Sequence, residues 1–167
     1  IYRHTPEKAI DNLAVVCFDE IDGGLNKKGF GVDFLLSNNL ECFFVSHAKK
    51  SFFQWLSEDD LLLHLGPFLK GKKTFTYGAS LGGYAALYYS DVLQAKAIAF
   101  SPRCSIDPLY DNAKQFDVNF KHIPLSKKEL KSNLSPVVVV DPQVPPDKKF
   151  LVSRILPLYK ENISLIE

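Results

Sequence analysis

The chain has 167 residues, which suits one domain with a sizeable core. It is 46% hydrophobic and 23% charged, and its formal net charge of +1 gives no electrostatic attraction to nucleic acid or to an anionic membrane. No run approaches the roughly 20 apolar residues that a bilayer-spanning helix needs. We therefore expect a single domain over 1–167, with no nucleic-acid partner and no membrane span.

The sequence contains three cysteines, Cys17, Cys42 and Cys104. An odd number without close pairing predicts neither a disulfide framework nor a metal site. Cys17 and Cys42 lie in apolar runs and are expected to be buried and inert, whereas Cys104 is a candidate for an exposed thiol near a pocket. We expect a cytoplasmic protein that uses no metal and no cofactor.

Strand-like and helix-like apolar runs follow one another along the chain. Strands are predicted at 13–18, 41–46, 73–77, 95–100, 136–140 and 162–167. Helices are predicted at 32–39, 58–69, 81–90 and 147–160, with a short one at 126–132. The helix at 58–69 begins after the capping residue Ser57, and Gly66 and Pro67 are expected to kink or end it.

This alternation of strands and helices predicts the fold class. Strands that are separated by helices pair in parallel, so we expect a three-layer α/β/α sandwich with a mainly parallel sheet. Two stretches interrupt the pattern, a Gly- and Asp-rich loop at 19–31 and a polar, irregular stretch at 101–135. Ligands of such sheets bind at the carboxyl ends of the strands, where both stretches begin.

Residues 78–82, Gly-Ala-Ser-Leu-Gly, match the pattern G-x-S-x-G between a predicted strand and a predicted helix. Such a turn is so tight that side chains two residues from the serine would collide, so glycine is needed at Gly78 and Gly82. Gly83 lets the helix pack closely on the sheet. Ser80 would project at the N-terminus of that helix, whose dipole favours developing negative charge. The pattern predicts a nucleophile elbow with Ser80 as the nucleophile.

Five stretches share their local motifs with a known group of proteins: GFGVDFL, FFVSHAKKSFFQWLS, FTYGASLGGYAALYY, AIAFSPRCSIDP and VVVVDPQVPPDKKF. Through them nearly the whole chain resembles the α/β-hydrolase superfamily and, more narrowly, hydrolase-like proteins of bacterial capsule and surface-polysaccharide loci. The resemblance implies a serine hydrolase (esterase) that forms an acyl-serine intermediate and acts on an acylated carbohydrate. Two alternatives stay open: an O-acyltransferase for a surface polysaccharide, and a non-catalytic binding domain that retains the elbow.

The resemblance also implies a triad in the chain order serine, acid, histidine, with the acid after a later strand. Asp141 and Asp147 both follow the strand at 136–140, and resemblance to the group favours Asp147. Val144 stands where the commoner superfamily pattern has its acid, so Asp141 remains an alternative, and Asp107 is a third. In the absence of a catalytic role, Asp147 would cap a helix and Asp141 would form a turn.

The base of this triad is expected to be a histidine after the last predicted strand, where the sequence shown stops at Glu167. The chain opens on Ile1 and contains no methionine. We therefore expect a fold that lacks the C-terminal histidine loop, in a sequence incomplete at both ends, with the catalytic histidine beyond Glu167. His122 is the alternative base. The other histidines are expected to be structural or exposed: His4, His47 and His64.

An oxyanion hole needs two backbone N–H groups. One is the N–H of Leu81, and by resemblance the second comes from Asp19 or Glu20, in the loop after the first strand. Arg103, after the strand at 95–100, is a candidate for binding an anionic group of the substrate. The expected partner is a small-molecule or saccharide ester.

Overall fold

The computed structural model describes residues 1–167 and contains one seven-stranded sheet, in the order β1-β3-β2-β4-β5-β6-β7. The strands are β1 Tyr2–His4, β2 Leu13–Phe18, β3 Cys42–Val45, β4 Lys73–Ala79, β5 Lys96–Phe100, β6 Val137–Val139 and β7 Ser164–Ile166. β1 runs antiparallel to β3, and all other neighbouring strands are parallel. The predicted, mainly parallel sheet is confirmed.

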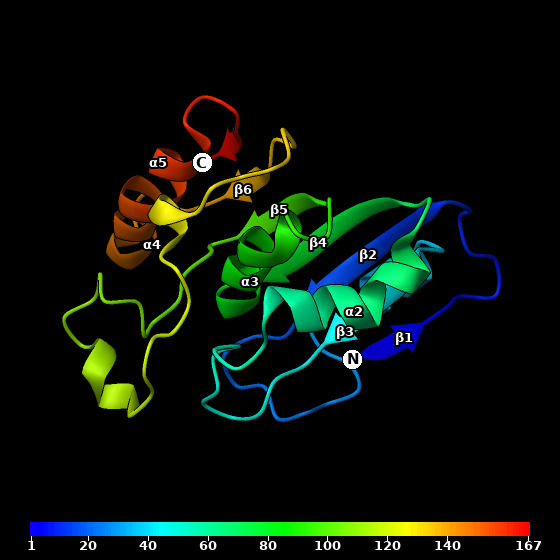
Figure 1. The fold of residues 1–167 in the computed structure, drawn as a ribbon, viewed down its shortest axis with the longest axis horizontal. Helices are drawn as coiled ribbons and strands as arrows, with labels where there is room; N and C mark the ends of the chain where they lie inside the picture. Colours follow the sequence, from blue (N-terminus) through cyan, green and yellow to red (C-terminus); the bar gives the residue numbers. More distant parts are fainter.

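Helices lie on both faces of this sheet. They are α1 Val32–Ser37, α2 Glu58–Leu69, α3 Leu81–Ser90, α4 Pro145–Phe150 and α5 Leu156–Tyr159, with 3₁₀ turns at Ala113–Phe116 and Leu125–Lys127. Figure 1 shows α2 and α3 lying across one face, with the C-terminal helices on the β6 side of them. The three-layer arrangement expected from the sequence is therefore present.

The two faces of the sheet carry cores of different size, because successive strand residues point to opposite faces. Val16 and Phe18 of β2 belong to the larger core, which includes Leu61 of α2 and Tyr84 of α3. Val15 of β2 lies in the smaller core with residues of β3 and α1. α3 lies in the larger core and is buried along its whole length. That burial fixes the position of the helix that follows Ser80.

Most predicted elements are confirmed, and the exceptions have physical reasons. The edge strand β1 was not predicted, because it has only three residues and pairs only with β3, so its sequence shows no alternation of apolar and polar residues. α2 continues through Pro67 to Leu69, since its buried residues extend from Leu61 to Leu69 and packing offsets the hydrogen bond that proline removes. The helix predicted at 126–132 is wrong, because only the 3₁₀ turn Leu125–Lys127 forms there.

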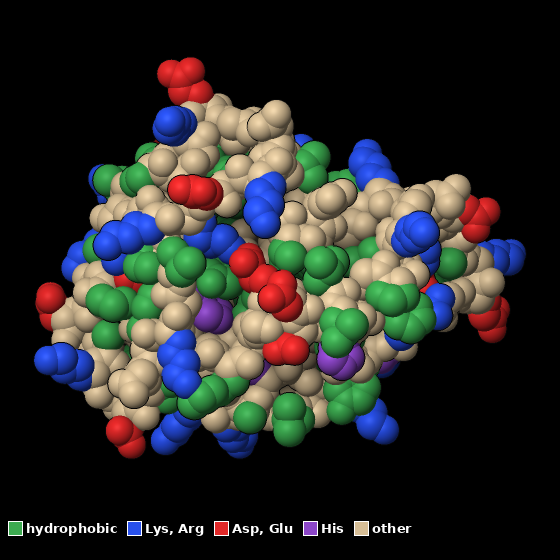
Figure 2. All heavy atoms as spheres, viewed as in Figure 1, with side chains coloured by type: hydrophobic (Ala, Val, Ile, Leu, Met, Phe, Trp, Pro, Cys, Tyr) green, Lys and Arg blue, Asp and Glu red, His purple; other side chains and the backbone are tan.

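The surface carries no dominant sign of charge on the face shown in Figure 2, where basic side chains are scattered over both the rim and the middle. Acidic side chains gather near its centre, in keeping with the three acidic residues in the first turn of α2, Glu58, Asp59 and Asp60. Carboxylates at that position interact favourably with the helix dipole. None of the helices combines the length and the apolar character needed to cross a bilayer.

The helix predicted at 147–160 is interrupted by a π-helical turn, Leu151–Ile155, between α4 and α5. Arg154 on this turn binds the fully buried Asp107, with 2.7 Å from Nη2 to Oδ1 and 3.0 Å from Nε to Oδ2. The wider turn places this guanidinium against a carboxylate that follows β5. The ion pair joins the 101–135 stretch to the C-terminal helices.

Replacing Arg154 by Met is expected to lower the free energy of unfolding by about 3–5 kcal/mol, because Asp107 is then a buried charge without a counter-ion. The double variant Asp107→Asn/Arg154→Met is expected to lose less, since no charge is left buried. Urea denaturation of the two variants and the parent measures both values. An equal loss in both variants would contradict a role for the ion pair.

Candidate active site

Ser80 lies at the point where β4 turns into α3. Its backbone angles, φ 51° and ψ −117°, fall in a sparsely populated region that costs a non-glycine residue roughly 1–3 kcal/mol. Hydrogen bonds on both sides hold this conformation: the Ser80 N–H donates to Phe100 O (2.8 Å), and the Arg103 N–H donates to Ser80 O (3.1 Å). The neighbouring strand β5 and the residues after it therefore fix the turn.

Three glycines make the turn possible. A Cβ on Gly78 would lie 2.3 Å from the Gly82 backbone, and a Cβ on Gly82 would lie 2.3 Å from Phe18 O at the end of β2. A Cβ on Gly83 would lie 3.0 Å from Phe100 O. Backbone thus approaches backbone on three sides of Ser80, which is the geometry of a nucleophile elbow.

Ser80 stands at the N-terminus of α3. Ser80 is the N-cap residue, yet its hydroxyl makes no capping hydrogen bond, and the side chain is half-buried. Leu81 is the first helical residue, so its N–H has no partner within the helix. A free hydroxyl and a free N–H therefore occur together at the positive end of the helix dipole.

The two aspartates predicted after β6 differ in their surroundings. Asp147, in the first turn of α4, is 3% exposed, and its Oδ1 accepts a hydrogen bond from Arg103 Nη1 at 2.9 Å. Asp141 is exposed, and its Oδ1 accepts from the Gln143 N–H at 2.8 Å, which closes a local turn. The third candidate, Asp107, is bound to Arg154. Only Asp147 is joined to the elbow, through Arg103.

Arg103 connects Asp147 to the turn at Ser80. Its backbone N–H bonds Ser80 O, while its guanidinium, whose side chain is 37% exposed, bonds Asp147. Arg103 also lines a pocket of about 200 Å³, together with Ser105, Tyr110, Asn112, Phe116 and Pro146. The remaining guanidinium N–H groups have no protein partner, so they are free to bind a ligand in this pocket.

The sequence alternative for the base, His122, lies inside a cage of tyrosines. Its Nδ1 is 2.7 Å from the Tyr84 hydroxyl, and its Nε2 is 3.0 Å from Phe53 O. The ring stacks on Tyr88 with centroids 4.1 Å apart. Burial lowers the pKa of His122 to about 4. Because both nitrogens have partners within the core, this geometry does not present His122 to Ser80.

The other histidines are also engaged away from Ser80. His64 bonds Asp60 O within α2, and His4 bonds Lys27 O. His47, after β3, is buried, with Nε2 2.8 Å from Glu20 O and Nδ1 2.9 Å from Ala48 O. No histidine of the chain forms a hydrogen bond with Ser80.

The two N–H groups expected for the oxyanion hole, those of Asp19 and Glu20 after β2, both donate hydrogen bonds within the protein. The Asp19 N–H donates to Val45 O at 3.1 Å, which continues the sheet ladder. The Glu20 N–H donates to the carboxylate of Asp19 itself, at 3.0 Å from Oδ1. Asp19 is 3% exposed. Its burial could not be read from the Gly- and Asp-rich composition of 19–31, where a carboxylate is ordinarily solvated.

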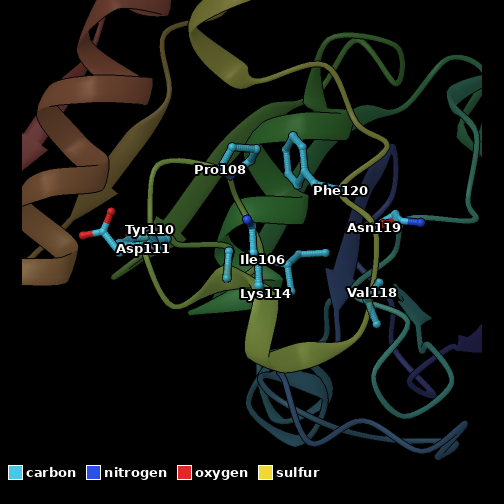
Figure 3. A pocket seen from close by; sticks show the side chains of 9 residues that line it. Ile106, Pro108, Tyr110, Asp111, Lys114, Val118, Asn119 and Phe120 are labelled. Carbon is cyan, nitrogen blue, oxygen red and sulfur yellow. The ribbon is translucent and has the colours of Figure 1, made fainter.

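The largest pocket, about 680 Å³, lies within the 101–135 stretch, and none of the predicted site residues lines it. Figure 3 shows Pro108 and Phe120 on one side of it, Ile106 and Lys114 near its middle, and the Asp111 carboxylate directed away. Cys104, expected to be an exposed thiol, is completely buried, and burial raises its pKa to about 12. That expectation was wrong because Cys104 packs into the larger core.

Several solved structures have a fold similar to that of this chain. The capsule O-acetyltransferase of Neisseria meningitidis serogroup A aligns with a TM-score of 0.66 and 13% identity, over 95% of this chain and 79% of that one. The chain has an α/β-hydrolase-like fold. A dienelactone hydrolase from Anabaena variabilis (TM-score 0.57, 13% identity, 98% and 76% covered) and a monoglyceride lipase from Saccharomyces cerevisiae (0.58, 13%, 98% and 79%) are also similar. No protein-family model and no curated protein matches the chain.

Gly82→Ala is expected to destabilise the α/β-hydrolase-like fold by several kcal/mol, because the new methyl would lie 2.3 Å from Phe18 O and the backbones must separate. The matched control is Gly66→Ala in α2, where the new methyl meets only Leu62 at 3.5 Å. That change is expected to stabilise by up to about 1 kcal/mol through helix propensity. Denaturant unfolding measures both, and equal effects would contradict the close approach.

Acidification is expected to destabilise the protein through His122. Its pKa is about 4 when folded and 6.5 ordinarily, so between these values the unfolded chain binds the extra proton and stability falls as pH falls. The loss between pH 7.5 and 5 is about 2 kcal/mol from this group. His122→Gln should reduce that slope and His64→Gln should not, as measured by urea unfolding at both pH values. An unchanged slope in His122→Gln would contradict the assignment.

Proposed function

We propose that this protein is a serine hydrolase of the α/β-hydrolase type that acts on an ester through an acyl-serine intermediate. The observation that carries the proposal is the strained backbone of Ser80, held by three close glycine contacts at the N-terminus of α3. Backbone strain of this kind persists where the surrounding structure enforces it, and it clusters at functional sites. The esterase and lipase names among the structural neighbours support the same chemistry.

The proposed reaction has two steps. The Ser80 Oγ forms a bond to the ester carbonyl carbon while its proton passes to a base, and the alcohol leaves when the C–O bond breaks and takes up that proton. Water then attacks the acyl-serine, which releases the acid and regenerates Ser80. In both steps the Leu81 N–H and the dipole of α3 stabilise the negative charge that develops on the carbonyl oxygen.

We assign the acid of the triad to Asp147 and the base to a histidine beyond Glu167. Asp147 is supported by its burial and by its connection to Ser80 through Arg103. The position of the base is supported by β7, which pairs in parallel with β6, so the chain after Ile166 leaves the sheet at the edge where the strand ends lie. Asp141, exposed and occupied in a turn, is the weaker candidate acid.

An O-acyltransferase is the second candidate, favoured by the likeness to the capsule O-acetyltransferase over 95% of this chain. Transfer differs from hydrolysis only in the second step, where a sugar hydroxyl replaces water. For an acylated saccharide, we propose that Arg103 contacts the substrate in the pocket it shares with Asn112 and Ser105. With an activated acetyl ester and methyl glucoside as acceptor, a predominance of acetylated glucoside over acetate would favour transfer.

Ser80→Ala is expected to abolish covalent labelling of the full-length protein by a fluorophosphonate, because the reagent bonds to Oγ as fluoride leaves. Asp147→Asn should slow labelling by about 10²–10⁴-fold, since the base then loses its orienting carboxylate. Intact-protein mass spectrometry over time gives the rates.

Asp141→Asn is the matched control, because it removes a carboxylate that also follows β6 but only closes a turn. Its labelling rate should stay within about twofold of the parent. A folded full-length protein that never acquires the label would instead indicate a binding domain that retains the elbow.

A further inference from the structure

Asp19 is a buried carboxylate whose second oxygen has no partner. The side chain is 3% exposed, and Oδ2 is the one buried side-chain polar atom in the chain without a hydrogen bond. Its other oxygen, Oδ1, accepts the Glu20 N–H at 3.0 Å. A carboxylate can accept about four hydrogen bonds, so this group is poorly satisfied for its depth.

Glu20 follows the end of β2, next to the strand that leads into Ser80. In the β2–β4 pairing the last partners are Cys17 and Tyr77, so Glu20 and Ser80 each come three residues after that pair on neighbouring strands. The segment at the end of β2 also lies close to the first turn of α3, since a Cβ on Gly82 would lie 3.0 Å from Asp19 O. Because the Asp19 N–H is already bonded to Val45 O, Glu20 is the residue whose N–H is left to complete an oxyanion hole.

We propose that Asp19 keeps the oxyanion hole of Ser80 closed in the resting state, by holding the Glu20 N–H, and that the hole opens when the carboxylate releases it. This inference rests on the proposed function of Ser80. An oxyanion that needs the Glu20 N–H must compete with the Asp19 carboxylate for this one donor. It must also form next to the negative charge of that carboxylate, in a site that water solvates poorly. The carboxylate thereby limits how fast the acyl-serine forms.

The surroundings of Asp19 make this closure sensitive to charge. His47, in the segment after β3, is the titratable group that faces it, and Glu20 is its neighbour on the loop, while Gly23, Gly29 and Phe44 enclose the carboxylate without adding charge. Burial raises the pKa of Asp19, against the smaller opposing effects of the Glu20 N–H and His47. Protonation removes the charge that competes with the oxyanion, so lower pH favours the open hole.

The backbone after Glu20 is also held in place. His47 Nε2 lies 2.8 Å from Glu20 O, which belongs to the next peptide unit, so Glu20 is hydrogen-bonded on both sides of its Cα. Gly23 packs between the two side chains, and a Cβ there would lie 2.8 Å from both Asp19 Oδ2 and His47 Nε2. The main chain at Glu20 therefore has one preferred orientation.

The test is the rate of fluorophosphonate labelling of Ser80 in full-length parent, Asp19→Asn and Asp19→Ala. Removing the charge should speed labelling, by about 10- to 100-fold in Asp19→Ala and by less in Asp19→Asn, whose amide oxygen still accepts the Glu20 N–H. One oxyanion donor is worth about 10²–10³-fold in rate, which sets the upper limit. Asp22→Asn, an exposed carboxylate on the same loop, is the control and should leave the rate unchanged.

A purely structural role for Asp19 predicts the opposite sign, because a loosened loop slows labelling. The ratio of the labelling rate of Asp19→Asn to that of the parent is a second readout. Titration of the catalytic base affects both rates equally, so it does not change this ratio. This ratio should fall toward one as pH is lowered, when the parent carboxylate becomes protonated. If Asp19→Ala does not fold, as judged by circular dichroism, Asp19→Asn and its pH dependence still decide.

The outcomes separate this inference from the proposed function. A labelled parent with Asp19 variants that are folded and no faster would overturn the closure and leave the hydrolase intact. An unlabelled parent that becomes reactive at Ser80 in Asp19→Ala would support both. Absence of labelling in every folded variant would overturn both.

Discussion

The proposed site depends on how closely the end of β2 approaches the first turn of α3. With no side chain on Gly82, Phe18 O comes within a distance that no Cβ tolerates. This approach brings the loop after β2 level with Ser80, and Gly78 and Gly83 allow the same closeness on the other sides. The complete burial of α3 supplies the packing energy that offsets the strained backbone of Ser80.

Much of the fold could be predicted because local sequence signals and packing agree. The bounds of β2 and α3 follow from continuous apolar runs, and the start of α2 follows from the capping residue Ser57, whose hydroxyl accepts the Asp60 N–H. The turn at Ser80 could be predicted from its motif, although only Gly78 is required by a contact within a few residues, whereas Gly82 and Gly83 approach Phe18 O and Phe100 O. β1 and the π-helical turn could not, because each is fixed by a partner distant in sequence and leaves no local period.

The site could be predicted only in part, since an ion pair between the segments that follow two different strands leaves no pattern in the sequence. Asp147 was chosen by resemblance, and nothing local indicates that Arg103 binds it 44 residues away. His122 was weighed as a base because it lies in an irregular stretch, yet the aromatic residues of α3 enclose it. The Gly- and Asp-rich composition of 19–31 is typical of a solvent-exposed loop, whereas the glycines around Asp19 let the loop close over its carboxylate.

The π-helical turn between α4 and α5 has a consequence for how the chain tolerates insertions and deletions. Deleting one residue between Asp147 and Arg154 would replace the π-helical turn by regular helical spacing, and the wider turn that carries Arg154 would be lost. Arg154 would then leave Asp107, while Asp147 would keep its place beside Arg103. The length of this segment is therefore constrained by a buried charge, and substitutions in it should be accepted far more readily than a change of one residue in its length.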